Sequence, residues 1–179
     1  MRMNVPWLSA IALLFACSAG FAAAPKTGDA PPDVTLGTDI DGNAVKLADY
    51  PGNVVVISFW ASWCGPCRKE LPVLDSLEKA AQAKQLPLQV IAVNIEDRDT
   101  FRRFARKLGD ALHLKLVNER NGRSASAYGV KPIPHMVIVG RDGRILDVHV
   151  GYGESSLDGI LAEINRALAA DAAAAPSNG

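Results

Sequence analysis

Two predominantly apolar runs, residues 54–60 and 88–95, are the clearest pattern along the chain. Each has the length of a strand and is rich in Val and Ile, which is typical of strands buried on both faces of a sheet. Between them, residues 66–83 repeat apolar side chains at helical spacing. Pro66 suits the first turn of such a helix, because its missing N–H would have no partner there. The pattern therefore predicts a parallel β-α-β unit.

Weaker patterns on both sides of this unit predict further elements. Residues 34–36 and 44–47 flank a turn at Asp41-Gly42, which predicts an N-terminal hairpin. An apolar stripe that stops at Gly109 predicts a helix capped by Asp99 or Thr100. The other expected elements are a strand at 114–117, a helix at 122–128, a hairpin of strands 136–139 and 145–150, and a last helix that starts near Ser155 and buries Ile160, Leu161, Ile164 and Leu168.

The composition sets broad limits on the protein. Its 179 residues are 49% apolar and carry a formal net charge of zero. This size predicts one domain with a sizeable core, and the charge gives no bulk attraction to nucleic acid. We expect the folded domain over residues 31–170, after a linker at 25–32 that contains Pro and Gly, and a flexible tail over residues 171–179.

The N-terminus predicts export from the cytoplasm. Arg2 precedes an uncharged, largely apolar run, so residues 1–24 are expected to form a signal peptide that is cleaved after Ala22. Two other fates stay open, namely lipidation of Cys17 in a loose lipoprotein box and retention of the run as a membrane anchor. Each fate leaves the remaining chain outside the cytoplasm, which predicts a periplasmic protein, either soluble or tethered to the membrane.

Cys64 and Cys67 are the two cysteines that remain beyond the signal peptide, and three roles are open to them. As a structural staple they would close a loop of about four residues, which stabilises by only ~2 kcal/mol. As half of a zinc site they would need a second pair of ligands, and His113, His135 and His149 are too widely spaced to form one. A copper(I) site needs fewer ligands, so it remains an alternative.

The third role is redox chemistry, and the surrounding pattern favours it. A Cys-x-x-Cys pair near a β-α-β unit is typical of a redox site. The predicted strand-to-helix junction places Cys64 at a helix N-terminus, where the helix dipole and free N–H groups stabilise a thiolate. Cys64 would therefore be the attacking sulfur. Cys67, one turn further, would resolve the mixed disulfide.

The motif Trp63-Cys64-Gly65-Pro66-Cys67 resembles the active site of thioredoxin, and Ile133-Pro134 resembles the cis-proline signature of that family. Pro72 and Gly151 also stand where thioredoxins carry these residues. The resemblance implies an α/β thioredoxin fold with a central mixed sheet flanked by helices. The export signal, the N-terminal hairpin and a central insert at 96–121 are similar to the TlpA/ResA-like branch.

The resemblance also implies roles for individual residues. Thioredoxin has a buried aspartate at the position of Ser58, and in the TlpA/ResA-like branch a glutamate at the position of Glu70 takes over its role as proton acceptor. His135 stands where the branch usually has Thr, and it either tunes the sulfurs or points away from them. The implied catalytic residues are Cys64, Cys67 and Glu70, and the implied substrate-binding residues are Trp63, Gly65, Pro66, Ile133 and Pro134.

The expected function is thiol–disulfide exchange with exported protein substrates, with the dithiol acting as a reductant. We expect no metal and no cofactor, and we expect a membrane protein to supply electrons for recycling. The N-terminus offers a possible membrane attachment. Two alternatives remain open, namely a copper(I)- or haem-pathway binding module that uses the same dithiol, and a disulfide oxidase.

Overall fold

The computed structural model of the chain describes residues 23–109 and 111–170. The predicted signal peptide up to Ala22, including Cys17, and the predicted tail at 171–179 lie outside the described residues. The predicted β-α-β unit is confirmed as β3 (Val54–Trp60), α1 (Gly65–Ala83) and β4 (Leu88–Asn94). β3 and β4 are parallel, with Val56 opposite Val90.

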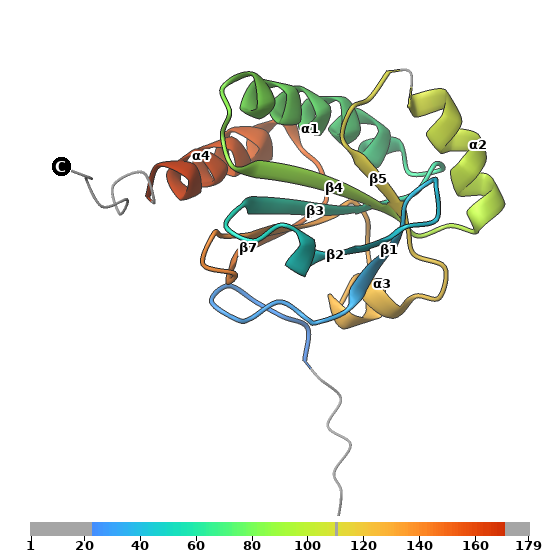
Figure 1. The fold of residues 1–179 in the computed structure, drawn as a ribbon, viewed down its shortest axis with the longest axis horizontal. Coiled ribbons are helices and arrows are strands. Elements are labelled where there is room, and N and C mark those ends of the chain that lie inside the picture. Colours follow the sequence, from blue (N-terminus) through green and yellow to red (C-terminus); the bar gives the residue numbers. More distant parts are fainter. Residues whose placement is uncertain (1–22, 110, 171–179) are drawn as a thin grey trace, which may run out of the picture.

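The strands form one mixed sheet of seven, in the order β2-β1-β5-β4-β3-β6-β7 (Figure 1). β3 lies well inside the sheet, parallel to β4 and antiparallel to β6. Both predicted hairpins are confirmed, β1 with β2 at one edge and β6 with β7 at the other. The remaining strands are β1 (Thr35–Thr38), β2 (Ala44–Lys46), β5 (Lys115–Asn118), β6 (His135–Val139) and β7 (Ile145–Val150).

Helices cover both faces of the sheet. Figure 1 shows α1 and α4 on one face, α3 beneath the other and α2 at one end. The helices other than α1 are α2 (Arg98–Leu108), α3 (Arg123–Ala127) and α4 (Glu154–Ala170), with a short 3₁₀ helix η1 (Leu47–Asp49) after β2.

The cap predicted for α2 is wrong. The N-cap is Asp97, whose side chain accepts hydrogen bonds from the backbone N–H groups of Asp99 and Thr100 at 3.1 and 2.9 Å. Asp99 and Thr100, the two residues predicted to be the cap, instead lie inside the helix and donate their N–H groups to the cap. Asp, Asp and Thr at 97, 99 and 100 are all good N-cap types, so residue preference alone does not choose among them.

Successive residues of β3 point to opposite faces of the sheet, so the strand contributes side chains to two hydrophobic cores. Val54, Val56 and Trp60 belong to the core under α1 and α4, which also contains both cysteines. Val55, Ile57 and Phe59 belong to the opposite core. A strand buried on both faces in this way explains why the run is apolar at nearly every position.

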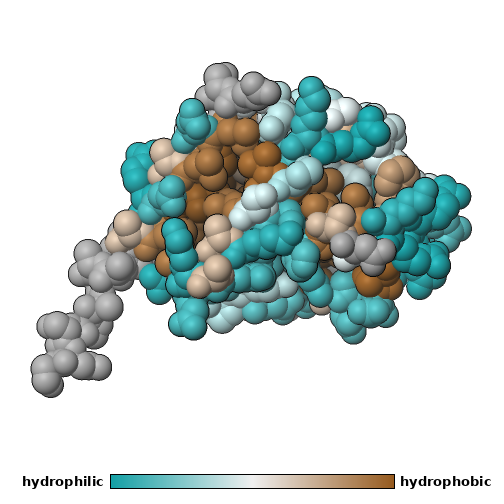
Figure 2. All heavy atoms as spheres, turned by 90° about the horizontal axis from the view of Figure 1, so that it is seen from above, coloured by the Kyte–Doolittle hydropathy of each residue, from teal (hydrophilic) through white to brown (hydrophobic). Residues whose placement is uncertain are grey.

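The stripe predicted on α4 is only partly buried. Ile160 and Ile164 are buried as expected, whereas Leu161 and Leu168 keep part of their surface exposed. The face seen in Figure 2 is apolar mainly in the half that contains α4, and hydrophilic at the end that contains α2. α2 carries the exposed side chains Arg102, Arg103, Arg106 and Lys107.

The segment read as a linker is held against the sheet. The backbone N–H of Gly28 donates to the carbonyl of Ile145 at 2.8 Å, and the N–H of Ile145 donates to Asp29 at 3.0 Å. The Arg144 guanidinium also donates to the Gly28 carbonyl at 3.0 Å. These bonds satisfy backbone groups at the start of β7, an edge strand whose unpaired groups would otherwise be open to other chains.

His135, the first residue of β6, is buried in the core opposite the cysteines. It lies opposite Phe59 in the sheet, while its neighbour Met136 lies opposite Ser58 on the other face. Its ring meets that of Phe59 edge to face, with centroids 6.2 Å apart, and Tyr128 packs on the same Phe59 at 5.7 Å. Among the described residues neither ring nitrogen of His135 has a hydrogen-bond partner, and the Tyr128 hydroxyl also lacks one.

This environment opposes charge on His135, because burial lowers its pKa below the ordinary value of 6.5. As the pH falls below 6.5, His135 binds a proton in the unfolded chain but not in the folded chain, so the free energy of unfolding decreases. We predict that His135→Thr removes this part of the acid destabilisation. Urea unfolding between about pH 7.5 and pH 5 should show the wild-type free energy of unfolding falling by up to ~1 kcal/mol per pH unit more than that of the variant.

The exposed His113 gives a matched control, because His113→Thr removes a histidine outside the core. That variant keeps the buried His135 and should therefore keep the loss of stability at low pH that His135 causes. Identical pH dependence for wild type and His135→Thr would contradict a neutral, buried His135.

Candidate redox site

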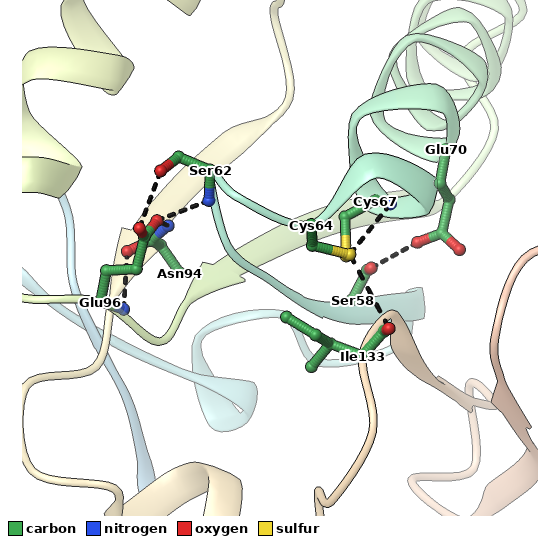
Figure 3. Close-up of a disulfide and its surroundings, with 8 residues drawn as sticks. All are labelled: Ser58, Ser62, Cys64, Cys67, Glu70, Asn94, Glu96 and Ile133. Atoms are coloured by element: carbon green, nitrogen blue, oxygen red, sulfur yellow. Dashed lines mark hydrogen bonds between the residues drawn. A yellow bond between two sulfur atoms is a disulfide. The ribbon is translucent and has the colours of Figure 1, made fainter.

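Cys64 and Cys67 form a disulfide at the start of α1 (Figure 3). Cys64 is the N-cap residue, and the backbone N–H of Cys67 donates to its Sγ at 3.2 Å. Pro66, in the first turn, leaves no unpaired N–H at its own position. The helix dipole and this N–H group would stabilise negative charge on the Cys64 sulfur once the disulfide is reduced. Both cysteines are buried, Cys67 more completely than Cys64.

The loop before β6 lies directly against the disulfide. The Ile133–Pro134 peptide bond, for which the sequence predicts the cis form, is cis. The carbonyl oxygen of Ile133 lies 3.7 Å from Cys64 Sγ. The carbonyl of Pro134 accepts a hydrogen bond at 2.8 Å from the N–H of Gly151, which follows β7. The loop before β6 therefore meets the start of α1 at the sulfur of Cys64, and the residue that follows β7 is bonded to that loop.

The other residues expected to bind substrate differ in exposure. Gly65 is half-buried and Pro66 exposed on the first turn of α1. The Trp63 side chain is 70% exposed, whereas Trp60, three residues earlier, is buried in the core. An exposed Trp directly before the N-cap cysteine is available to contact a partner protein.

Glu70 is buried one turn beyond Cys67, with only 2% of its surface exposed. The Ser58 hydroxyl donates to Glu70 Oε1 at 2.6 Å, and Figure 3 shows the carboxyl group directed at Ser58 on β3. Burial raises the pKa of Glu70 to about 7, although the hydrogen bond from Ser58 acts in the opposite direction. A carboxyl group with this pKa can accept or release a proton near neutral pH.

Sequence reasoning identified Glu70 but missed its partner. Ser58 was noted for the aspartate that it replaces, and its hydrogen bond to the glutamate was not expected. The signal was present, because Ser58 is the one small polar residue in the apolar run 54–60. A lone hydroxyl in a strand buried on both faces requires a hydrogen-bond partner.

A second polar cluster, also missed from the sequence, fixes the loop before Cys64. The backbone N–H and the hydroxyl of Ser62 both donate to the Glu96 carboxylate, at 2.6 and 2.7 Å. Asn94 donates to the same carboxylate at 2.9 Å, and Asn118 donates to the Glu96 backbone carbonyl at 2.8 Å. The predicted insert is thereby joined to the redox loop. The signal for this cluster was the polar run that follows β4, at the carboxyl ends of parallel strands, where sites gather.

Two further features, metal-binding clusters and membrane-spanning helices, are absent from the described part of the chain. Within residues 23–109 and 111–170, His, Cys, Asp and Glu side chains nowhere gather in threes that could hold a metal ion. Across the same ranges, no helix combines the length and apolar character needed to cross a bilayer.

Known proteins resemble this chain in both sequence and fold. The family model described as Redoxin matches residues 26–164. The thiol-disulfide oxidoreductase ResA of Geobacillus thermodenitrificans is 31% identical over 129 residues, which cover 72% of this chain and 71% of ResA. The range that the family model matches contains both cysteines, the Ile133–Pro134 loop and the central insert.

Solved structures extend the comparison to the fold. A structure described as the thiol:disulfide interchange protein DsbE of Chlorobium tepidum aligns with a TM-score of 0.71 and 32% identity, covering 82% of this chain and 99% of that one. The exposed lipoprotein thioredoxin Etrx1 of Streptococcus pneumoniae aligns with a TM-score of 0.64 and 27% identity, covering 75% and 99%. The mixed sheet between helices is thus a thioredoxin fold, and the chain belongs to the redoxin family of the thioredoxin superfamily, as a ResA-like thiol–disulfide oxidoreductase.

Proposed function

We propose that this oxidoreductase acts outside the cytoplasm and uses the Cys64–Cys67 dithiol to reduce disulfides in exported proteins. The observation that carries the proposal is the position of Cys64. It caps α1, where the Cys67 N–H donates to its sulfur, and it lies 3.7 Å from the Ile133 carbonyl, beside a backbone segment that an incoming chain can meet.

The first step is attack by the Cys64 thiolate on a substrate disulfide. A bond forms between Cys64 Sγ and one substrate sulfur, and the second substrate sulfur leaves as a thiolate and takes a proton from solvent. The N–H of Cys67 and the dipole of α1 favour the thiolate form of Cys64. The backbone of Ile133, whose carbonyl lies next to the reacting sulfur, would pair with the substrate chain.

The second step releases the reduced substrate. Glu70, with its pKa near neutrality, accepts the proton of Cys67 directly or through a water molecule. The Cys67 thiolate then attacks Cys64 Sγ, and the bond between Cys64 and the substrate breaks. The substrate sulfur leaves as a thiolate and is protonated. The substrate disulfide has become two thiols, and the protein is left with the Cys64–Cys67 disulfide.

The residues around the cysteines favour reduction over oxidation of substrates. A more stable Cys64 thiolate makes the reduced form more favourable and the pair more oxidising. Only Gly65 and Pro66 lie between the cysteines, so no basic side chain there adds its charge to the helix N-terminus in stabilising the Cys64 thiolate. The thiolate is therefore stabilised less, and the pair is more reducing. Arg68 and Lys69 follow the motif and raise the potential somewhat above that of thioredoxin.

The N-terminal sequence and one of the similar proteins support a location for this chemistry. The predicted signal peptide and the likeness to Etrx1, described as an exposed lipoprotein, both support a location outside the cytoplasm. A reductase in an oxidising compartment needs a continuing supply of electrons. We therefore propose a membrane protein as the donor that reduces the Cys64–Cys67 disulfide after each turnover.

Replacing the resolving cysteine should trap the substrates. In Cys67→Ser the first step proceeds and the second cannot, so mixed disulfides between Cys64 and substrate proteins should accumulate. Non-reducing electrophoresis of extracts that contain exported proteins, followed by mass spectrometry, should identify them. Cys64→Ser is the matched control and should trap few proteins. A correctly folded Cys67→Ser protein that forms no mixed disulfides would contradict the proposal.

Replacing Glu70 should change the pH dependence of substrate release. In the wild type, release from the mixed disulfide should accelerate as the pH rises toward about 7, because Glu70 becomes able to accept a proton. In Glu70→Gln this rise should disappear, and release near neutral pH should slow by about tenfold or more. Stopped-flow Trp fluorescence in single-turnover mixing would give the rate at each pH.

Ser58→Ala is the matched control for this experiment, because it keeps the carboxyl group and removes the hydrogen bond that lowers its pKa. Its rate profile should shift to higher pH and keep its shape. A stability measurement gives an independent test. Because the pKa of Glu70 is raised, the contribution of Glu70 to the free energy of unfolding falls as pH rises from 4.5 to about 7, so the free energy of unfolding of the wild type relative to that of Glu70→Gln should fall over this range. Identical rate profiles for wild type and Glu70→Gln would remove Glu70 from the mechanism.

A further inference from the structure

A groove of about 590 Å³ opens beside the disulfide. One wall is the first turn of α1, and the other is the loop that leads from β7 to α4. Its lining residues are Gly65, Pro66, Arg68, Lys69, Tyr152 and Gly153.

The groove is positively charged. Arg68 and Lys69 are both exposed, and neither forms an ion pair with another described residue. The lining residues whose side chains the structure describes include no Asp or Glu. The positive charge is local, because the whole chain has zero formal net charge. Two unneutralised cations at a concave surface attract an anionic group and favour binding of a carboxylate over an amide of the same shape.

The groove continues the path that a substrate would take across the redox site. Gly65 and Pro66 separate the two cysteines and also line the groove, so disulfide and groove share an edge. The opposite wall begins just after Gly151, whose N–H is bonded to the carbonyl of Pro134. An extended chain that pairs with Ile133 and presents its sulfur to Cys64 would therefore place neighbouring side chains over the groove.

We propose that this groove makes the enzyme prefer protein substrates that carry Asp or Glu within a few residues of the reacting cysteine. The inference rests on the proposed reductase function and assigns Arg68 and Lys69 as determinants of specificity. The Arg68 guanidinium can hold a carboxylate through two parallel hydrogen bonds, and Lys69 adds a second charge. Exposed ion pairs are individually weak, so together they should give about a fivefold preference that declines as salt shortens the Debye length to about 10 Å or less.

Three peptides with one internal disulfide test this inference. They differ only in the two residues that flank the reacting cysteine, which are Asp in the first, Asn in the second and Lys in the third. The reduced protein is mixed with each peptide, and the second-order rate constant for reduction is measured at low ionic strength. The wild type should reduce the Asp peptide about fivefold faster than the Asn peptide and the Lys peptide most slowly.

Charge reversal in the groove should reverse this order. Arg68→Glu/Lys69→Glu should reduce the Lys peptide faster than the Asp peptide. The double variant Lys84→Glu/Lys107→Glu changes the net charge equally at two exposed sites that do not line the groove, so it should keep the wild-type order. The readout is the ratio between the rate constants for the three peptides, because a change in the reduction potential of the Cys64–Cys67 pair alters all three rate constants together.

The two proposals fail in different ways. Equal reduction of the three peptides by the wild type would overturn the specificity inference and leave the reductase function intact. If Arg68→Glu/Lys69→Glu reduces the three peptides in the same order of rates as the wild type, the specificity inference is also overturned. Failure of the reduced protein to act on any peptide would overturn the reductase function and, with it, this inference.

Discussion

The packing of α1 across β3 is the constraint on which the redox site depends. β3 is buried along its whole length and is held between β4 and β6, so its carboxyl end is fixed in the middle of the sheet. α1 packs on one face of this strand through Leu71 and Leu74. The chain must therefore turn at one place, between the end of β3 and the start of the helix, and Cys64 caps the helix at that turn.

The same packing brings Glu70 into the core. With Cys64 at the N-cap, the residue one turn beyond Cys67 faces β3, and a carboxyl group there loses its contact with water. Such a group is costly to bury as an anion, and a single hydrogen bond from Ser58 offsets only part of the cost. The consequence is a pKa near neutrality. One helix on one strand thus positions both the sulfur that we propose as the nucleophile and the carboxyl group that we propose as the proton acceptor.

The elements that could be predicted from the sequence are those that local pattern determines. β3 and β7 were predicted residue for residue, because an apolar run or a hairpin strand bounded by turn residues leaves few alternatives. The site cysteines were equally clear, because their spacing and the preceding strand carry the signal. The predicted cap of α2 was wrong because three residues within four positions suit the N-cap and only the folded backbone selects Asp97.

The features that were missed depend on contacts between distant parts of the chain. The Glu96 carboxylate anchors Ser62, 34 positions earlier, and a local pattern contains no information about such a pairing. The docking of Gly28 on Ile145 is of the same kind, since a Pro- and Gly-containing segment looks like a free linker. For His135 the sequence left two orientations open. The strand register decides between them, because a one-residue step moves a side chain to the other face of the sheet.

The reduction potential of the Cys64–Cys67 pair is the most direct test of this account. Equilibration in glutathione or dithiothreitol buffers, followed through Trp fluorescence, would give the midpoint at pH 7. With Gly-Pro between the cysteines, the account predicts a value nearer thioredoxin, at about −270 mV, than the strong oxidant DsbA, at about −120 mV. A midpoint close to about −120 mV would contradict the reductant proposed here and would indicate a disulfide oxidase in its place.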